Sequence, residues 1–413
     1  MRSLRIAFCL SLALAGYGST HTDWQNLRDK IRATLHIPEP LPNIEAKAYD
    51  HFSPVPDVTA ERVSYATDYG LRVPAIVYHA AGATIAQHPA IVIVNGHGGD
   101  KSSWYAWWAG ILYARAGAVV LTYDPIGEYE RNALRQSNTL QHDEVIPPED
   151  MGRRMGGLMI TDVMQAVHYL EERRDVDPKR IAVLGYSLGS FISSIACAVD
   201  TRVRACVLVG GGDLDSSGGY WDSSRKMCQA IPYRSLDFLG DRGAMIYALN
   251  AKRGPTLVFN GSDDEVVDIP HHGQDFFTDL RARTIQALGS SRDVFDFQFA
   301  PGGGHRPYFL AKPVALWLED KLRFPNWTRK QIQQMGETPI RDWAASHAVN
   351  PPGGSIANEH GEGGTLALGV DIPPVPRSEL HAIPESVWDS QRERYVYETW
   401  VDRAKSAIAA GAP

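Results

Sequence analysis

Residues 180–199 read "RIAVLGYSLGSFISSIACAV" and hold a strand pattern, a turn and a helix pattern in succession. The apolar run at the start is typical of a strand buried on both faces, and the last ten residues are typical of a helix. Ser187 lies between them, flanked by Gly185 and Gly189. Such a sharp turn needs glycine, because a Cβ would clash with neighbouring backbone, and it raises the serine hydroxyl above the sheet. We therefore interpret Ser187 as a candidate nucleophile.

Strand and helix patterns alternate on both sides of this turn, over residues 63–324. "PAIVIVNG" (89–96) is one of several continuous apolar runs that predict buried strands, and "AWWAGILYARAG" (106–117) is one of the helical segments between them. Alternation over this length predicts an α/β fold with a mainly parallel, twisted sheet and helices on both faces. Polar stretches at 125–155 and 211–253 interrupt it, and we predict that both are loop insertions over the site.

The N-terminus has the pattern of a secretory signal peptide. Arg2 and Arg5 flank the apolar run "IAFCLSLALAG", which is too short to span a bilayer as a permanent helix. We therefore predict a secreted or periplasmic protein without a stable membrane anchor. The predicted organisation is a signal peptide over residues 1–20, a helix and connector over 21–60, a catalytic domain over 61–324, and a C-terminal extension over 325–413 packed on that domain.

Composition excludes one class of partner. The chain of 413 residues has a formal net charge of -7, with 44% hydrophobic and 22% charged residues, as expected for a globular protein. Nucleic-acid binding requires a basic surface to neutralise phosphates, and no basic segment is present. We expect a small-molecule or carbohydrate partner instead.

The cysteines predict neither a disulfide framework nor a metal site. Cys9 would leave with the signal peptide, and Cys197, Cys206 and Cys228 would remain. Three thiols cannot all pair, and their spacing matches no zinc motif, so we predict no metal and no cofactor. Buried free thiols are the favoured interpretation, with a bridge between Cys197 and Cys206 as the alternative.

A serine nucleophile needs a base and a carboxylate, and both follow later strands. His305 lies in the glycine-rich stretch "APGGGHRPYF" after the last predicted strand, where it could take the serine proton. "LVFNGSDDEVVD" ends another strand and supplies Asp264, with Asp263 as the alternative, to orient the imidazole. Ligands of parallel sheets bind beyond the carboxyl ends of the strands, so these side chains are expected to meet Ser187 there.

Attack on an ester would place negative charge on the carbonyl oxygen, which needs two N–H donors. We predict the backbone N–H of Leu188 as one donor, because it follows the nucleophile. The other is expected in the glycine turn "NGHGGDK" (95–101), from the N–H of His97, with Gly98 as the next choice.

In combination, "NGHGGDK", "YDPIGEYER", "VDPKRIAVLGYSLGS", "GSDDEVV" and "GGGHRPYF" resemble the α/β-hydrolase superfamily, and within it the secreted acetyl xylan esterase and dienelactone-hydrolase-like group. The resemblance covers roughly residues 60–323. It implies an α/β-hydrolase fold and a serine carboxylester hydrolase acting on small acyl esters of carbohydrate. The implied roles are nucleophile for Ser187, triad partners for Asp264 and His305, and oxyanion hole for His97 and Leu188. Asn95 departs from the His found there in many members, and dienelactone hydrolases proper use Cys where this chain has Ser187.

Three further residues are candidate substrate contacts. Trp104 could stack on a sugar, although its helical spacing favours core packing, and Glu128 and Arg131 could hold a substrate group, although a structural ion pair is the favoured interpretation. Two alternative functions stay open. One is a serine peptidase of the prolyl oligopeptidase type, which shares the triad order, and the other is a non-catalytic hydrolase fold used for binding.

Overall fold

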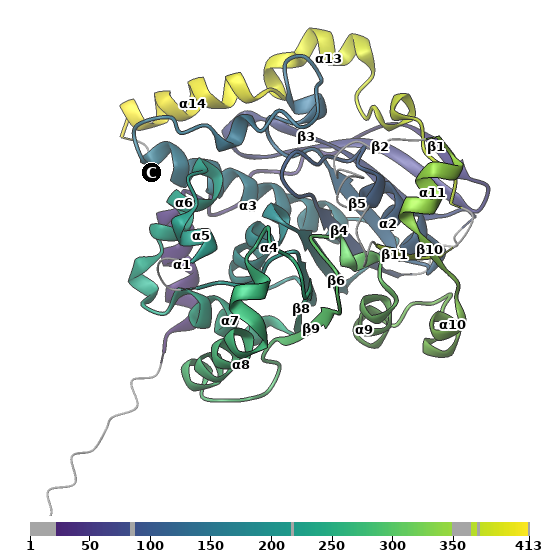
Figure 1. Cartoon of the computed structure of the whole chain (residues 1–413). Coiled ribbons are helices and arrows are strands. Elements are labelled where there is room, and N and C mark those ends of the chain that lie inside the picture. The colour runs from purple at the N-terminus through teal and green to yellow at the C-terminus, as the bar shows by residue number, and fades with distance from the viewer. Residues whose placement is uncertain (1–21, 83–86, 216–218, 349–364, 370–371, 412–413) are drawn as a thin grey trace, which may run out of the picture.

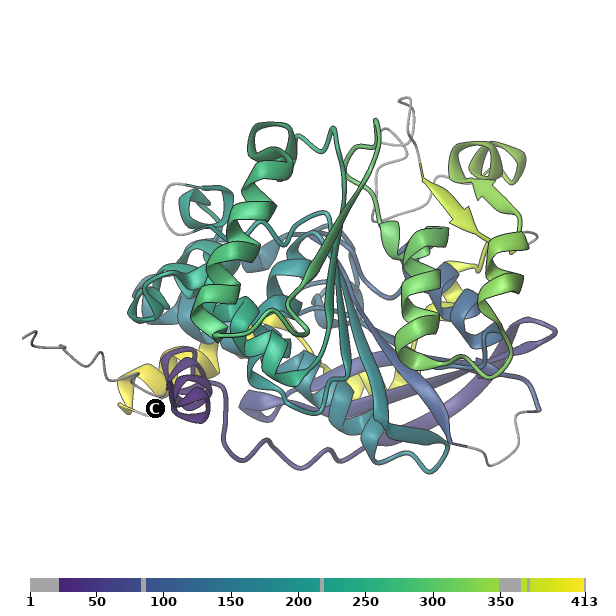
Figure 2. The same ribbon diagram turned by 90° about the horizontal axis from the view of Figure 1, so that it is seen from below.

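The computed structural model describes residues 22–82, 87–215, 219–348, 365–369 and 372–411. Its centre is a nine-stranded sheet with helices on both sides (Figures 1 and 2). Among the described residues, no helix combines the length and the apolar character that crossing a membrane would require. The predicted signal peptide lies outside the described residues.

The sheet has an antiparallel edge and a parallel body. Its order is β1-β2-β3-β5-β4-β6-β7-β8-β9, in which β1, β2, β3 and β5 pair antiparallel and the remaining neighbours pair parallel. The parallel strands all point their carboxyl ends to one edge, where a ligand site is expected. The strands are β1 (Lys47–Val55), β2 (Val58–Ala66), β3 (Arg72–Ala80), β4 (His88–Val94), β5 (Val119–Tyr123), β6 (Val176–Tyr186), β7 (Ala205–Val209), β8 (Thr256–Gly261) and β9 (Asp296–Ala300).

Two apolar cores cover the two faces of the sheet. In β4, Val92 contributes to one core and its neighbours Ile91 and Ile93 to the other, as the two-residue period of a strand requires. Figure 2 shows the sheet close to edge-on between its helices. One face carries α1 (Trp24–Thr34), α3 (Asp150–Glu171), α4 (Leu188–Val199), α7 (Arg242–Arg253) and α8 (Ile269–Leu288), and the other carries α2 (Trp104–Arg115) and α9 (Lys312–Leu322).

The predicted fold class is confirmed, and two parts of the predicted organisation need revision. The sheet begins at Lys47, so the segment predicted as a connector up to residue 60 supplies β1 and the first residues of β2. The second insertion, predicted as a loop, is largely helical, because it holds α5 (Tyr220–Ser223), α6 (Met227–Arg234) and α7.

The described residues beyond 324 pack against the domain. Trp343 is buried against Trp107 and Trp108 of α2, with ring centroids 5.7 Å and 5.2 Å away. The C-terminal helices, yellow in Figure 1, run along the molecule, and α14 contacts α3. Large apolar side chains of the tail are therefore removed from water by the hydrolase core. The α-helices and strands in the described part of the tail are α10 (Arg329–Gln334), β10 (Glu337–Pro339), α11 (Ile340–Ser346), β11 (Leu366–Leu368), α13 (Glu385–Gln391) and α14 (Tyr397–Ala409).

Candidate active site

Ser187 occupies a strained turn between β6 and α4. Its backbone has φ 54° and ψ -120°, a conformation that side chains rarely adopt and that persists only where the surroundings enforce it. A Cβ on Gly185 would lie 2.2 Å from the carbonyl oxygen of Gly189, and a Cβ on Gly189 would lie 2.2 Å from that of Val94. Both flanking glycines are therefore required by close backbone packing, and the serine is held where helix α4 begins.

Asp264 and His305 meet at the carboxyl ends of β8 and β9. The Nδ1 atom of His305 lies 2.8 Å from Oδ2 of Asp264, whose side chain is fully buried. The other carboxylate oxygen, Oδ1, accepts a hydrogen bond from the Val266 N–H at 3.1 Å. Asp263 is exposed and accepts from the Ser262 hydroxyl instead. Of the two aspartates considered from the sequence, Asp264 is the one that contacts the histidine.

The His305 ring lies beside the turn that carries Ser187. Its centroid is 5.0 Å from that of Tyr186, and a Cβ on Gly210 would lie 2.8 Å from its Cε1 atom. The preceding residue, Val209, accepts the Ser187 N–H at 2.9 Å, so the end of β7 lies next to both groups. Among the hydrogen bonds of the described residues, none joins Ser187 Oγ to His305. In serine hydrolases without substrate, the distance between the serine and the histidine is often long, and it shortens when substrate binds.

The two predicted oxyanion donors lie next to the nucleophile. Leu188 is the first residue of α4, and the first N–H groups of a helix have no acceptor within the helix. The turn after β4 passes close by, since a Cβ on Gly96 would lie 3.0 Å from the Cβ of Ser187, and His97 follows directly. Asn95 is buried beneath this turn and donates its amide to the Tyr123 carbonyl at 2.9 Å.

Trp104 lies in the core and is only 1% exposed. Its ring packs edge-on against Tyr105 and Trp108, at centroid distances of 6.0 Å and 6.4 Å. The structure therefore gives this side chain a packing role, and it offers no exposed face for a sugar to stack on.

Glu128 and Arg131 are also buried, and they anchor the first insertion. The Glu128 carboxylate accepts the N–H groups of Thr139 and Leu140 at 3.1 Å and 3.0 Å, and burial raises its pKa to about 7. Arg131 pairs with Asp162 of α3 at 2.5 Å. The two residues do not pair with each other: Glu128 joins two parts of the insertion, and Arg131 joins the insertion to α3.

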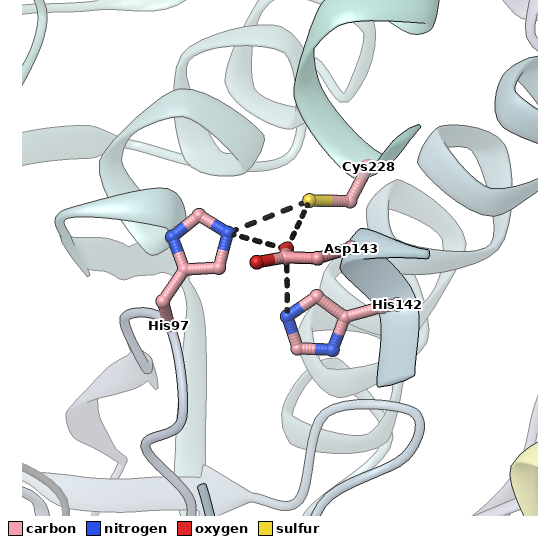
Figure 3. A group of neighbouring side chains, drawn as sticks. All are labelled: His97, His142, Asp143 and Cys228. Carbon is pink, nitrogen blue, oxygen red and sulfur yellow. Dashed lines mark hydrogen bonds and ion pairs between the residues drawn. The ribbon is translucent and has the colours of Figure 1, made fainter. Parts of the chain in front are cut away.

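The structure also brings together a group that the sequence did not indicate: His97, His142, Asp143 and Cys228 (Figure 3). Their ligand atoms all lie within 4.8 Å of one another. Burial lowers the pKa of both imidazoles, that of His142 to about 4. No motif spacing could have revealed the group, because the residues come from three separate segments.

The three cysteines among the described residues, Cys197, Cys206 and Cys228, are free and buried. This is the state favoured from the sequence for Cys197 and Cys206, whose bridge was the alternative.

Comparison with known proteins finds similarity over the region that carries this site. The family model of the prolyl oligopeptidase family matches residues 149–333, a range that includes Ser187, Asp264 and His305. Thiohydrolase apmlB of Arthrinium phaeospermum is 30% identical over 150 residues, which cover 36% of this chain and 42% of that relative. The chain thus spans less than half the length of this relative.

Two solved structures share the architecture at low sequence identity. Methylesterase BT1017 superimposes with a TM-score of 0.51 at 20% identity, over 81% of this chain and 72% of that one. The acetyl xylan esterase from Paenibacillus sp. R4 superimposes with a TM-score of 0.50 at 16% identity, over 74% and 96% of the two chains. At 20% and 16% sequence identity, the similarity shows a shared fold and nothing more.

Proposed function

The chain has the α/β-hydrolase fold, and on this premise we propose that it is a serine carboxylester hydrolase working through an acyl-enzyme intermediate. The observation that carries the proposal is the hydrogen bond between Asp264 and His305 beside the strained turn of Ser187. A buried carboxylate on Nδ1 fixes the imidazole tautomer that leaves Nε2 free to accept a proton.

In the proposed mechanism, His305 takes the Ser187 proton as Oγ attacks the carbonyl carbon. The N–H groups of Leu188 and His97 would stabilise the oxyanion, and the positive end of helix α4 would add to this effect. The alcohol leaves with the proton from His305. Water, activated by the same imidazole, then attacks the acyl group on Ser187 and releases the acid.

We propose small acyl esters, such as acetyl groups on plant polysaccharide or its fragments, as substrates. The support is the family resemblance of the sequence motifs together with the fold shared with an acetyl xylan esterase. The test is turnover of p-nitrophenyl acetate, acetylated oligosaccharides and feruloylated oligosaccharides by the full chain, with Ser187→Ala as the blank. Hydrolysis by wild type alone supports the proposal, and wild type that matches the blank on every ester contradicts it.

A second candidate is a serine peptidase, which is favoured by the match to the prolyl oligopeptidase family over residues 149–333. The two candidates share the same catalytic groups and differ in the leaving group. Cleavage of proline-containing peptides with little ester turnover would favour the peptidase, and ester turnover without peptide cleavage would favour the esterase.

Export is the remaining part of the proposal. It is supported by Arg2 and Arg5 ahead of an apolar run at the N-terminus. N-terminal sequencing of the protein from a bacterial host that exports it should find a mature start within residues 15–22, and an intact Met1 in the periplasm or medium would contradict export by cleavage.

A further inference from the structure

We propose that His97, His142, Asp143 and Cys228 form a binding site for one zinc-type divalent cation beside the active site. Each supplies one ligand atom, and Figure 3 shows the four side chains directed toward a common centre. Thiolate, imidazole and carboxylate are the ligands that zinc takes in proteins, usually four at a time in a tetrahedron.

Four of the six distances between the ligand atoms are close to those around a tetrahedral ion, and the other two are within 4.8 Å. Asp143 Oδ1 lies 2.9 Å from His97 Nε2, 3.2 Å from Cys228 Sγ and 3.8 Å from His142 Nε2, and the sulfur lies 3.5 Å from His97 Nε2. With ordinary zinc–ligand bond lengths, the edges of such a tetrahedron are about 3.3–3.7 Å. If the ligand atoms at these four contacts moved by a few tenths of an ångström, their distances would match those around a bound ion.

His142 is oriented as a metal ligand would be. Its Nδ1 lies 3.2 Å from the carbonyl oxygen of Ile126, so Nδ1 carries the proton and donates it there. The Nε2 atom is then unprotonated, and its lone pair points into the group. Nε2 has no hydrogen-bond partner, although the His142 side chain is only 1% exposed. A buried acceptor without a partner is costly, and a bound cation would satisfy it.

The charges and protons of the proposed site balance. Binding would displace the thiol proton of Cys228 to solvent, and the His97 proton would move from Nε2 to Nδ1. A thiolate and a carboxylate then neutralise a divalent ion. The second carboxylate oxygen of Asp143 stays paired with Lys226 Nζ, 3.3 Å away.

The same residues do not form a second nucleophilic triad. In a Cys-His-Asp triad the acid contacts the ring nitrogen remote from the thiol. Here Asp143 and Cys228 both approach Nε2 of His97, and the remote Nδ1 lies 3.5 Å from the side-chain amide of Gln229. Convergence on one point is the arrangement of ligands around an ion.

The location gives the proposed site a positioning role. His97 follows β4 in the turn next to Ser187, the pair His142 and Asp143 belongs to η3 (Gln141–Asp143) of the first insertion, and Cys228 belongs to α6 of the second. One ion would therefore connect both insertions to the turn that carries a proposed oxyanion donor.

The direct test is metal content and cobalt spectroscopy of the reduced full chain. Protein cleared of metal by dialysis against a chelator is expected to take up about one zinc per chain by elemental analysis. Cobalt in place of zinc should show thiolate-to-metal charge-transfer absorption and the intense visible bands of tetrahedral coordination. Wild type that takes up no stoichiometric zinc and gives a cobalt spectrum without a thiolate band overturns the proposal.

Variants separate this group from other thiols. Cys228→Ala is expected to lose the charge-transfer band. It should also weaken zinc binding by more than about 100-fold, because loss of a residue that only hydrogen-bonds to a ligand weakens binding by about 10- to 100-fold. The matched control is Cys197→Ala, another buried thiol outside the group, which should bind as wild type does. Circular dichroism confirms that each variant is folded. Equal zinc binding by folded Cys228→Ala and wild type would overturn the assignment.

Discussion

The carboxylate of Asp264 is oriented before any substrate arrives. It is buried at the end of β8, with one oxygen on the Val266 N–H and the other on His305 Nδ1. Asp263, one position earlier in the same turn, is exposed and contacts neither group. The two aspartates differ in environment far more than in sequence position, so they form a matched pair for experiment.

Asp264→Asn should lower kcat for p-nitrophenyl acetate by about 10³- to 10⁴-fold, because an amide in this place favours the wrong imidazole tautomer. The variant keeps the shape of the side chain, and its thermal unfolding should confirm a folded protein. Asp263→Asn, the control, should retain kcat within a few-fold. Similar losses in the two variants would contradict the assignment of Asp264 as the partner of His305.

At the scale of elements, the C-terminal extension holds the first insertion in place. Arg377 of η6 (Arg377–Leu380) donates to the hydroxyls of Ser102 and Ser137, at 2.9 Å and 2.8 Å, and lies 3.9 Å over the ring of Tyr129. The carboxylate of Glu130 accepts the N–H groups of Ala382 and Ile383. The same insertion supplies His142 and Asp143, so the tail acts on the neighbourhood of the active site through it.

Arg377→Ala should lower the free energy of unfolding by about 1–3 kcal/mol, since it removes charged hydrogen bonds and a cation–π contact. Hydrogen exchange of residues 125–145 should become faster. Arg392→Ala, at an exposed arginine of the same extension, should stay within about 0.5 kcal/mol of wild type. If both variants lose the same stability, the contacts of Arg377 are not what fixes the insertion.

The alternating elements could be predicted because long apolar runs and helical spacing carry strong local signals. β1 was missed because most of its side chains are exposed or half-buried, which leaves a weak pattern. Helices α5 and α6 of the second insertion were missed because both are short and α6 contains Pro232. Their conformation depends on packing against the domain more than on local propensity.

The candidate site also contains some residues that the sequence predicts and others that it does not. Ser187, Asp264 and His305 each follow a strand, so the sheet topology brings them to one edge and their sequence positions are informative. Cys228 and His97 are 131 residues apart, and they meet only because two insertions fold over the same turn. Contacts between insertions follow no short-range rule, and only the tertiary structure reveals them.

At the scale of the whole molecule, an ion-pair group ties the antiparallel edge of the sheet to the end of α3. Glu61 of β2 lies 3.0 Å from Nε2 of His79 on β3 and 2.7 Å from Nη1 of Arg173. Burial raises the pKa of Glu61, but the hydrogen bonds from His79 and Arg173 outweigh it and lower the pKa from 4.5 to about 2. The hydrogen bond that His79 donates to Glu61 raises the pKa of His79 above 6.5, and it outweighs burial, which lowers that pKa.

These shifts predict a pH-dependent contribution to stability. Because the folded pKa of Glu61 is depressed, its contribution is complete above about pH 5 and is lost as the pH falls toward 2. The pKa of His79 is raised, so its contribution is complete below 6.5 and is lost as the pH rises through the folded value. The free energy of unfolding, measured with urea, should therefore be higher for wild type than for Glu61→Gln, and the difference should be largest near pH 5–6. It should become smaller at lower and at higher pH. A difference that is constant from pH 3 to pH 8 would contradict this account.

The central claim is that Ser187 is the nucleophile, and covalent labelling tests it most directly. A fluorophosphonate probe reacts with a serine only where a base activates it and an oxyanion hole accepts the charge. Tandem mass spectrometry of the labelled full chain should find one adduct, on Ser187, and none on the folded Ser187→Ala variant. An unlabelled wild-type protein, or a principal adduct on another residue such as Ser190, would contradict the claim.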